Sequence, residues 1–201
     1  CCAIERIYVH EHHYDDFVDG FVNLARQYKL GNPLHAETTI GPMVNAAAAT
    51  FVRSQIRDAV AQGAVALVGE EHFAESAVGT AYLGPTVLVD VDHSMSVMRD
   101  ESFGPVIGIM KVRSDEEAIA HMNDSHYGLS ASIWTSDEAA AVRIGDQVET
   151  GTVYMNRCDY VDPALVWTGV KETGRGIALS SLGFDSYTQP KSFHLKKLRY
   201  P

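Results

Sequence analysis

Hydrophobic and polar residues alternate along this chain with two different periods. Apolar residues recur at near-helical spacing in four segments, which predict helices at residues 14–28, 51–60, 115–122 and 137–148. Short runs rich in apolar and β-branched residues predict strands at residues 7–9, 65–68, 83–91, 106–112, 130–134 and 151–156. The run at residues 65–68 predicts a short buried strand, and the continuously apolar run at 106–112 is typical of a parallel strand covered on both faces. Together they predict an α/β fold with a mainly parallel twisted sheet and helices on both of its faces.

The last stretch of the chain has a different pattern. Residues 186–198 alternate between polar and apolar side chains and end in basic residues. This pattern predicts an extended tail strand that is exposed or paired with another chain.

Composition and charge exclude several classes of function. Of the 201 residues, 46% are hydrophobic and 21% are charged, which is ordinary for a soluble globular protein. With 26 acidic and 16 basic residues the formal charge is −10, which argues against binding to nucleic acid or to an anionic membrane surface. No apolar run approaches the length of a membrane-spanning helix. Three cysteines do not make a disulfide framework, so we expect a reducing compartment, the cytoplasm.

The chain begins at a thiol. Cys1 stands where an initiator methionine would be expected, and the β-prone run Ile7-Tyr8-Val9 follows almost at once. We therefore expect the sequence to be the back portion of a longer protein. A cysteine thiolate is a strong nucleophile toward a carbonyl carbon, although an arbitrary cysteine is more often a small buried hydrophobe.

Two motifs about a hundred residues apart resemble one enzyme family. Cys1-x-Ala3-x-x-Arg6 before a strand resembles the nucleophile segment of the NAD(P)-dependent aldehyde dehydrogenases, and Glu101-Ser102-Phe103-Gly104-Pro105 resembles their Glu-x-Phe-Gly-Pro signature. The resemblance runs from Cys1 to about Leu198. Further segments follow in the family's order: Leu30-Gly31-Asn32-Pro33, Gly41-Pro42-Met43-Val44, Leu83-Gly84-Pro85-Thr86, Tyr127-Gly128-Leu129-Ser130, Gly151-Thr152-Val153-Tyr154-Met155-Asn156 and Gly169-Val170-Lys171-Glu172-Thr173-Gly174.

The resemblance implies a chemistry and assigns residues to it. Cys1 would add to an aldehyde, a hydride would pass from the resulting thiohemiacetal to NAD or NADP, and water would hydrolyse the thioester. Glu101 would bind the ribose of the nicotinamide, and Phe103 would flank the nicotinamide ring; the alternative for Glu101 is a solvated acidic loop. The residues that would line the aldehyde tunnel are Cys2, Asp159, Val161 and Trp167.

Other residues have weaker assignments. Arg6 would hold the nucleophile loop, or else form a surface ion pair. Asn156 is expected to serve the turn after its strand, and Cys158 is expected to be a packed thiol. Thr173 stands where the family has Ser, and Ile177 stands where it usually has an acidic residue, so local contacts there could differ.

The resemblance also predicts a domain organisation. Residues 1–185 would form the catalytic domain, and residues 186–201 would form an oligomerisation arm that pairs subunits in a homodimer or homotetramer. The family's general-base glutamate, its oxyanion-hole amide and its Rossmann cofactor domain lie upstream of the nucleophile and have no match here. We therefore expect that the upstream domain is absent, that it would hold most of the cofactor, and that this chain alone is inactive.

Two other functions compete with this one. A chain that starts with Cys could be an N-terminal-nucleophile hydrolase (an amidase), whose thiol is activated by its own α-amine and whose fold has antiparallel sheets. The chain could also be a structural domain that carries only an assembly arm. The cluster His10-Glu11-His12-His13 suggests a metal site, but contiguous residues rarely supply tetrahedral zinc geometry, so we expect a solvated turn and no metal.

Overall fold

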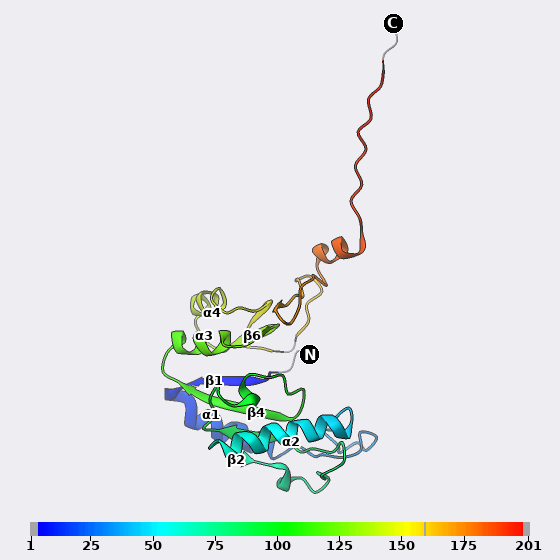
Figure 1. Ribbon diagram of the computed structural model, residues 1–201. Helices are drawn as coiled ribbons and strands as arrows, with labels where there is room; N and C mark the ends of the chain where they lie inside the picture. Colours follow the sequence, from blue (N-terminus) through cyan, green and yellow to red (C-terminus); the bar gives the residue numbers. More distant parts are fainter. Residues whose placement is uncertain (1–3, 159, 199–201) are drawn as a thin grey trace.

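The computed structural model describes residues 4–158 and 160–198, and a four-stranded sheet lies at its centre (Figure 1). The strands are β1 (Arg6–His10), β2 (Val65–Val68), β3 (Thr86–Val89) and β4 (Val106–Val112), in the spatial order β1-β4-β3-β2. The apolar strand β4 pairs in parallel with β1 on one side and with β3 on the other, as predicted. At the edge, β2 runs antiparallel to β3. This edge strand is covered only in part, and its first two residues, Val65 and Ala66, are exposed. The prediction of a buried strand was therefore wrong for this half of β2.

Helices cover both faces of the sheet, which confirms the predicted layers. Side chains alternate between the two faces of a strand, so Tyr8, Leu88 and Met110 pack with the buried side of α2 (Ala46–Ala61). The neighbouring positions Val9, Val87 and Ile109 pack with α1 (Tyr14–Ala25) on the opposite face.

Helix α2 begins earlier than the apolar spacing predicted. Its first turn is a run of alanines, which carry no periodic signal but are the strongest helix formers. The side chain of Asn45 accepts a hydrogen bond of 2.8 Å from the Ala48 N–H and so caps the helix.

The elements that follow β4 in the chain form a second group, which contains two helices and two pairs of short strands (Figure 1). Strands β6 (Ser130–Ile133) and β7 (Thr152–Met155) pair in parallel, with Ser130 opposite Thr152. Two short strands that were not predicted also pair, antiparallel to one another: β5 (Tyr127–Gly128) and β8 (Val170–Lys171). The helices are α3 (Asp115–Asn123), capped by Ser114, and α4 (Glu138–Gly145), capped by Asp137.

Four 3₁₀ helices complete the elements of the described residues. They are η1 (Glu11–His13), η2 (Glu70–His72), η3 (Ser96–Met98) and the longer η4 (Ser181–Tyr187). The longest α-helix of the described residues is α2, with 16 residues. No helix in this part of the chain combines the length and the apolar character needed to cross a membrane.

The end of the chain is extended but forms no strand within the described residues. After η4, residues 188–198 are exposed and lead away from the rest of the molecule (Figure 1). The predicted tail strand is therefore not formed in this single copy, and its first residues, Ser186 and Tyr187, belong to η4 instead. A strand requires a partner for its backbone hydrogen bonds, so pairing of this arm with another chain stays a prediction.

Candidate active site

The two motif segments adjoin neighbouring parallel strands. In the described residues, Ile4 and Glu5 precede β1, and residues 101–105 precede β4. Arg6 lies opposite Gly108 in the β1–β4 pair, so the segments before both strands lie at the same edge of the sheet. The turn that leads into β3 reaches this edge too, because the Thr86 N–H donates a hydrogen bond of 2.8 Å to the Pro105 carbonyl oxygen.

Two consecutive side chains tie the start of β1 to the second motif and to the segment before it. The carboxylate of Glu5 accepts hydrogen bonds from the backbone N–H groups of Ser102, at 3.2 Å, and Phe103, at 3.1 Å. Arg6 donates a 3.3 Å hydrogen bond to the carbonyl oxygen of Met98. Arg6 therefore holds the segment that leads into the second motif, and the sequence motif alone did not assign Glu5 any part.

Both predicted cofactor residues present their side chains to solvent. Glu101 is exposed, and Phe103 is 62% exposed although it is aromatic. The backbone of Phe103 has φ +51°, a left-handed conformation that bulky residues rarely adopt. Next to it, Gly104 fits tightly, because a Cβ there would lie 2.7 Å from Val52 Cγ2 and 2.8 Å from Met43 Cε. The turn thus holds a carboxylate and a ring outward while its backbone packs on the core.

The residues expected to line the aldehyde tunnel are only partly described. Cys1, Cys2 and Asp159 lie outside the described residues. Val161 is 46% exposed, and Trp167 is half-buried in the segment after β7. The backbone of Trp167 exchanges two hydrogen bonds with Ala178, at 2.7 Å and 2.9 Å, which fixes this segment in place.

The turn that starts at Lys171 holds the segment around β5. Lys171 Nζ donates hydrogen bonds to the carbonyl oxygens of Asn123, at 2.7 Å, and Ser125, at 3.0 Å, and pairs with Glu149 at 2.5 Å. The Thr173 hydroxyl accepts a 2.9 Å hydrogen bond from the Gly128 N–H. A serine hydroxyl at this position could accept the same bond, so the contact does not depend on the change from Ser to Thr.

Asn156 directly follows β7, and its side chain ties this end of β7 to the segment after β6. It has φ +55°, and its side-chain amide forms hydrogen bonds with both the N–H (2.9 Å) and the carbonyl oxygen (2.8 Å) of Thr135. In the histidine cluster, His10 Nδ1 accepts a hydrogen bond from the His12 N–H. Across residues 4–158 and 160–198, no three His, Cys, Asp or Glu side chains gather in a way that could hold a metal ion.

A polar chain that the sequence did not reveal lies on the α2 face of the sheet. The Tyr8 hydroxyl is 2.9 Å from His93 Nε2, and His93 Nδ1 is 2.8 Å from the Asp124 carboxylate. Because a carboxylate only accepts hydrogen bonds, Nδ1 of the ring carries a proton. Nε2 lies within hydrogen-bond distance of the Tyr8 hydroxyl, which also donates to the carbonyl oxygen of His121 at 3.3 Å. Burial lowers the pKa of His93, against the hydrogen bond to Asp124, and burial raises the pKa of Tyr8 to about 12. These shifts favour the neutral forms of both residues.

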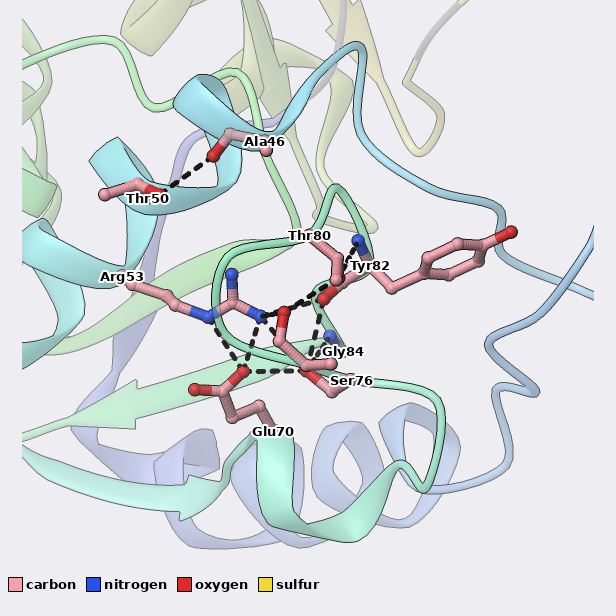
Figure 2. Close-up of polar contacts among 9 residues, drawn as sticks. Ala46, Thr50, Arg53, Glu70, Ser76, Thr80, Tyr82 and Gly84 are labelled. Carbon is pink, nitrogen blue, oxygen red and sulfur yellow. Dashed lines mark hydrogen bonds and ion pairs between the residues drawn. The ribbon is translucent and has the colours of Figure 1, made fainter.

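Figure 2 shows how α2 holds the long segment that leads to β3. Arg53 Nε donates a 2.9 Å hydrogen bond to Glu70, and Nη2 donates to the carbonyl oxygens of Ala77, at 3.1 Å, and Tyr82, at 2.8 Å. The Ser76 hydroxyl also donates to Glu70, at 2.7 Å. Burial opposes ionisation of Glu70, but the hydrogen bonds from Arg53 and Ser76 outweigh it and hold the pKa of Glu70 below its usual range.

Comparison with known proteins assigns the family. The sequence model described as "Aldehyde dehydrogenase family" matches residues 1–193. The chain belongs to the aldehyde dehydrogenase family. An aldehyde dehydrogenase of Paenarthrobacter nicotinovorans is 37% identical over 193 residues, which are 96% of this chain and 41% of that protein. Succinate-semialdehyde dehydrogenase [NADP(+)] 1 of Schizosaccharomyces pombe is 33% identical over 198 residues, 98% of this chain and 39% of that protein.

Solved aldehyde dehydrogenases have the same fold. Succinic semialdehyde dehydrogenase from Streptococcus pyogenes, solved with NADP⁺, has a TM-score of 0.87 and 32% identity over 96% of this chain and 42% of its own. Betaine aldehyde dehydrogenase from Staphylococcus aureus, solved with NAD⁺, has a TM-score of 0.84 and 30% identity over 93% of this chain and 37% of its own. The chain spans about two fifths of the length of the curated relatives that it matches.

The hydrolase alternative gains no support from these findings. It required antiparallel sheets, whereas β1, β4 and β3 pair in parallel. The family match over residues 1–193 assigns the chain to the aldehyde dehydrogenases instead.

Proposed function

We propose that this chain is the nucleophile-bearing part of an enzyme that oxidises an aldehyde to a carboxylic acid with NAD or NADP. The observation that carries the proposal is that β1 and β4 are neighbouring parallel strands whose N-terminal ends lie at the same edge of the sheet. The family's nucleophile motif leads into β1, and its Glu-x-Phe-Gly-Pro motif leads into β4. A hydride can pass only between groups held close together, so a shared edge is what this chemistry requires.

The residues of the second motif fit a nicotinamide cofactor. The exposed carboxylate of Glu101 can accept hydrogen bonds from both hydroxyls of a ribose, and the exposed ring of Phe103 can flank a flat heterocycle. A bound NAD or NADP supplies the acceptor for the hydride. The turn would orient the cofactor, because its backbone is held by Glu5 and packed against Val52 and Met43.

Cys1 is the proposed nucleophile. Its thiolate would attack the aldehyde carbon, and the thiohemiacetal that forms would lose its carbonyl hydrogen as a hydride and become a thioester on Cys1. Water would then cleave the thioester, release the acid and restore the thiol. Cys2, Asp159, Val161 and Trp167 are proposed to shape the path that the aldehyde takes to Cys1.

The domain organisation is proposed on the same basis. Residues 1–185 would form the catalytic domain, and residues 186–201 would form an arm that pairs with a second subunit of a homo-oligomer. The support is that Phe193 and Leu195 on this arm are 73% and 83% exposed, and apolar side chains gathered at a surface mark interaction sites. The low number of cysteines supports a reducing compartment, the cytoplasm.

The test is a turnover assay on the complete polypeptide that the gene encodes. Aldehydes of several chain lengths and charges are supplied with NAD or with NADP, and formation of the reduced cofactor and of the acid is measured. We expect turnover that Cys1→Ala abolishes, whereas Cys158→Ala retains it. Turnover that survives Cys1→Ala, or no turnover by the wild-type protein with any aldehyde, would refute the proposal.

A further inference from the structure

We propose that Glu5 is a positioning residue that sets the cofactor contacts relative to the nucleophile. This inference rests on the proposed function, because it concerns the same site. Glu5 has no assigned part in the motif that precedes β1. In the structure its carboxylate joins this motif to the one before β4.

The contact has the geometry of a small anion-binding nest. The N–H groups of two consecutive residues, Ser102 and Phe103, donate to the two different oxygens of one carboxylate, at 3.2 Å and 3.1 Å. Successive backbone N–H groups converge in this way where a turn contains a left-handed residue, and Phe103 with φ +51° is that residue. Hydrogen bonds to a charged acceptor are stronger than neutral ones, so Glu5 favours the conformation that Phe103 would otherwise avoid.

The polar side chains of the turn itself do not anchor it within the described residues. Ser102 is buried, with 4% of the residue exposed, and its hydroxyl has no hydrogen-bond partner among the described residues. The side chains of Glu101 and Phe103 extend into solvent instead of anchoring the turn. Packing at Gly104, the hydrogen bond from Thr86 to the Pro105 carbonyl oxygen and the two bonds to Glu5 therefore hold the backbone that carries Glu101 and Phe103.

Glu5 lies close in the sequence to the proposed nucleophile, so its contact links the nucleophile segment to the cofactor residues. Glu5 is four residues from Cys1 and adjoins Arg6, which binds the Met98 carbonyl oxygen. The start of β1 thus holds the second motif through Glu5 and the segment before it through Arg6, so a displacement of β1 would displace the motif. Glu5 would act on hydride transfer through the turn, without touching cofactor or aldehyde.

Glu5→Gln tests this role in the complete polypeptide. The amide keeps the length of the side chain but offers one acceptor oxygen, and its NH₂ group faces the second backbone donor. We expect kcat/KM for the cofactor to fall about tenfold, the size expected from loss of one charge-assisted hydrogen bond. The deuterium isotope effect with aldehyde labelled at the carbonyl carbon should rise, since a misplaced nicotinamide slows the hydride step. Glu11→Gln, an exposed acid just after the other end of β1, is the matched control and should match the wild type.

The outcomes separate this inference from the function on which it rests. If wild-type turnover is present and Glu5→Gln matches Glu11→Gln in kcat/KM and isotope effect, the positioning role is refuted and the proposed function stands. If the wild type produces no reduced cofactor, the proposed function fails and this role fails with it. Should Glu5→Gln not fold, Glu5→Asp decides: it keeps the charge but is too short to reach both donors, so a raised isotope effect is expected, and a wild-type value overturns the proposal.

Discussion

Replacing Arg53 by methionine tests whether one side chain of α2 holds the segment that leads into β3. Only 12% of the Arg53 side chain is exposed, and it binds Glu70 and the carbonyl oxygens of Ala77 and Tyr82 (Figure 2). Methionine keeps the apolar stem and its packing but removes every donor. The change therefore isolates the polar contacts.

The structure allows the magnitude to be estimated. Removing one partner of a well-buried ion pair costs about 3–5 kcal/mol. Glu70 is 36% exposed, so water can replace part of what its carboxylate loses, and the cost should be lower than for a fully buried pair. The two carbonyl oxygens also lose hydrogen bonds to a charged group, each worth about 1.5–3 kcal/mol before water compensates. We expect Arg53→Met to lower the free energy of unfolding by about 2–4 kcal/mol.

The assay is urea unfolding of the complete polypeptide, with Arg57→Met as the matched control. Arg57 lies one turn further along α2, its side chain is 74% exposed, and it pairs only with its neighbour Asp58 among the described residues, at 3.4 Å. Exposed pairs of this kind contribute about 0–1 kcal/mol. A shift in urea midpoint with an unchanged slope reports a change in stability. Equal midpoints for the two variants would refute the reasoning.

The same pair makes a prediction about pH. Because the folded state holds the pKa of Glu70 below its ordinary value of 4.5, the stabilisation is present above that value and is lost as the pH falls through the lower, folded-state pKa. The difference in stability between wild type and Arg53→Met should therefore be largest near neutral pH and shrink in acid. A difference that grows below the ordinary pKa would contradict the assigned charge on Glu70.

Three further predictions concern the site and its surroundings. Gly104→Ala should destabilise the fold by about 1–3 kcal/mol, because the added methyl group overlaps Val52; an unchanged melting temperature would show that the turn yields. Lys171→Met should cost about 1–2 kcal/mol in urea unfolding, since two carbonyl oxygens lose a charged donor, whereas the 57% exposed Glu149 regains water; a cost below about 0.5 kcal/mol would contradict this. Burial holds the pKa of His93 below its ordinary 6.5, so its contribution to stability is complete above that pH and is lost as the pH falls toward the folded-state pKa. Melting temperatures measured from about pH 7.5 to about pH 5.5 should fall less for His93→Gln than for wild type, and parallel curves would contradict the assignment.

The periodicity of apolar residues predicted the helices and strands that are long enough to show it. Residues 106–112 are apolar at every position but Gly108 and Lys111, and they became the central strand β4. The apolar spacing of residues 14–28 became α1, which ends at Ala25, a few residues before the predicted end. The alanine run of α2 and the two-residue strands β5 and β8 were missed, because alanine carries no periodic signal and two residues are too few to show one.

The amino-acid sequence by itself determined the family and the chemical groups, because Cys1, Glu101 and Phe103 stand in recognisable motifs. Only the tertiary structure decided how these segments are held. The contacts of Glu5 span 97 and 98 residues of sequence, and no local pattern records which distant N–H groups a carboxylate will meet. These contacts depend on the strand order β1-β4-β3-β2, which places the segments before β1 and β4 side by side.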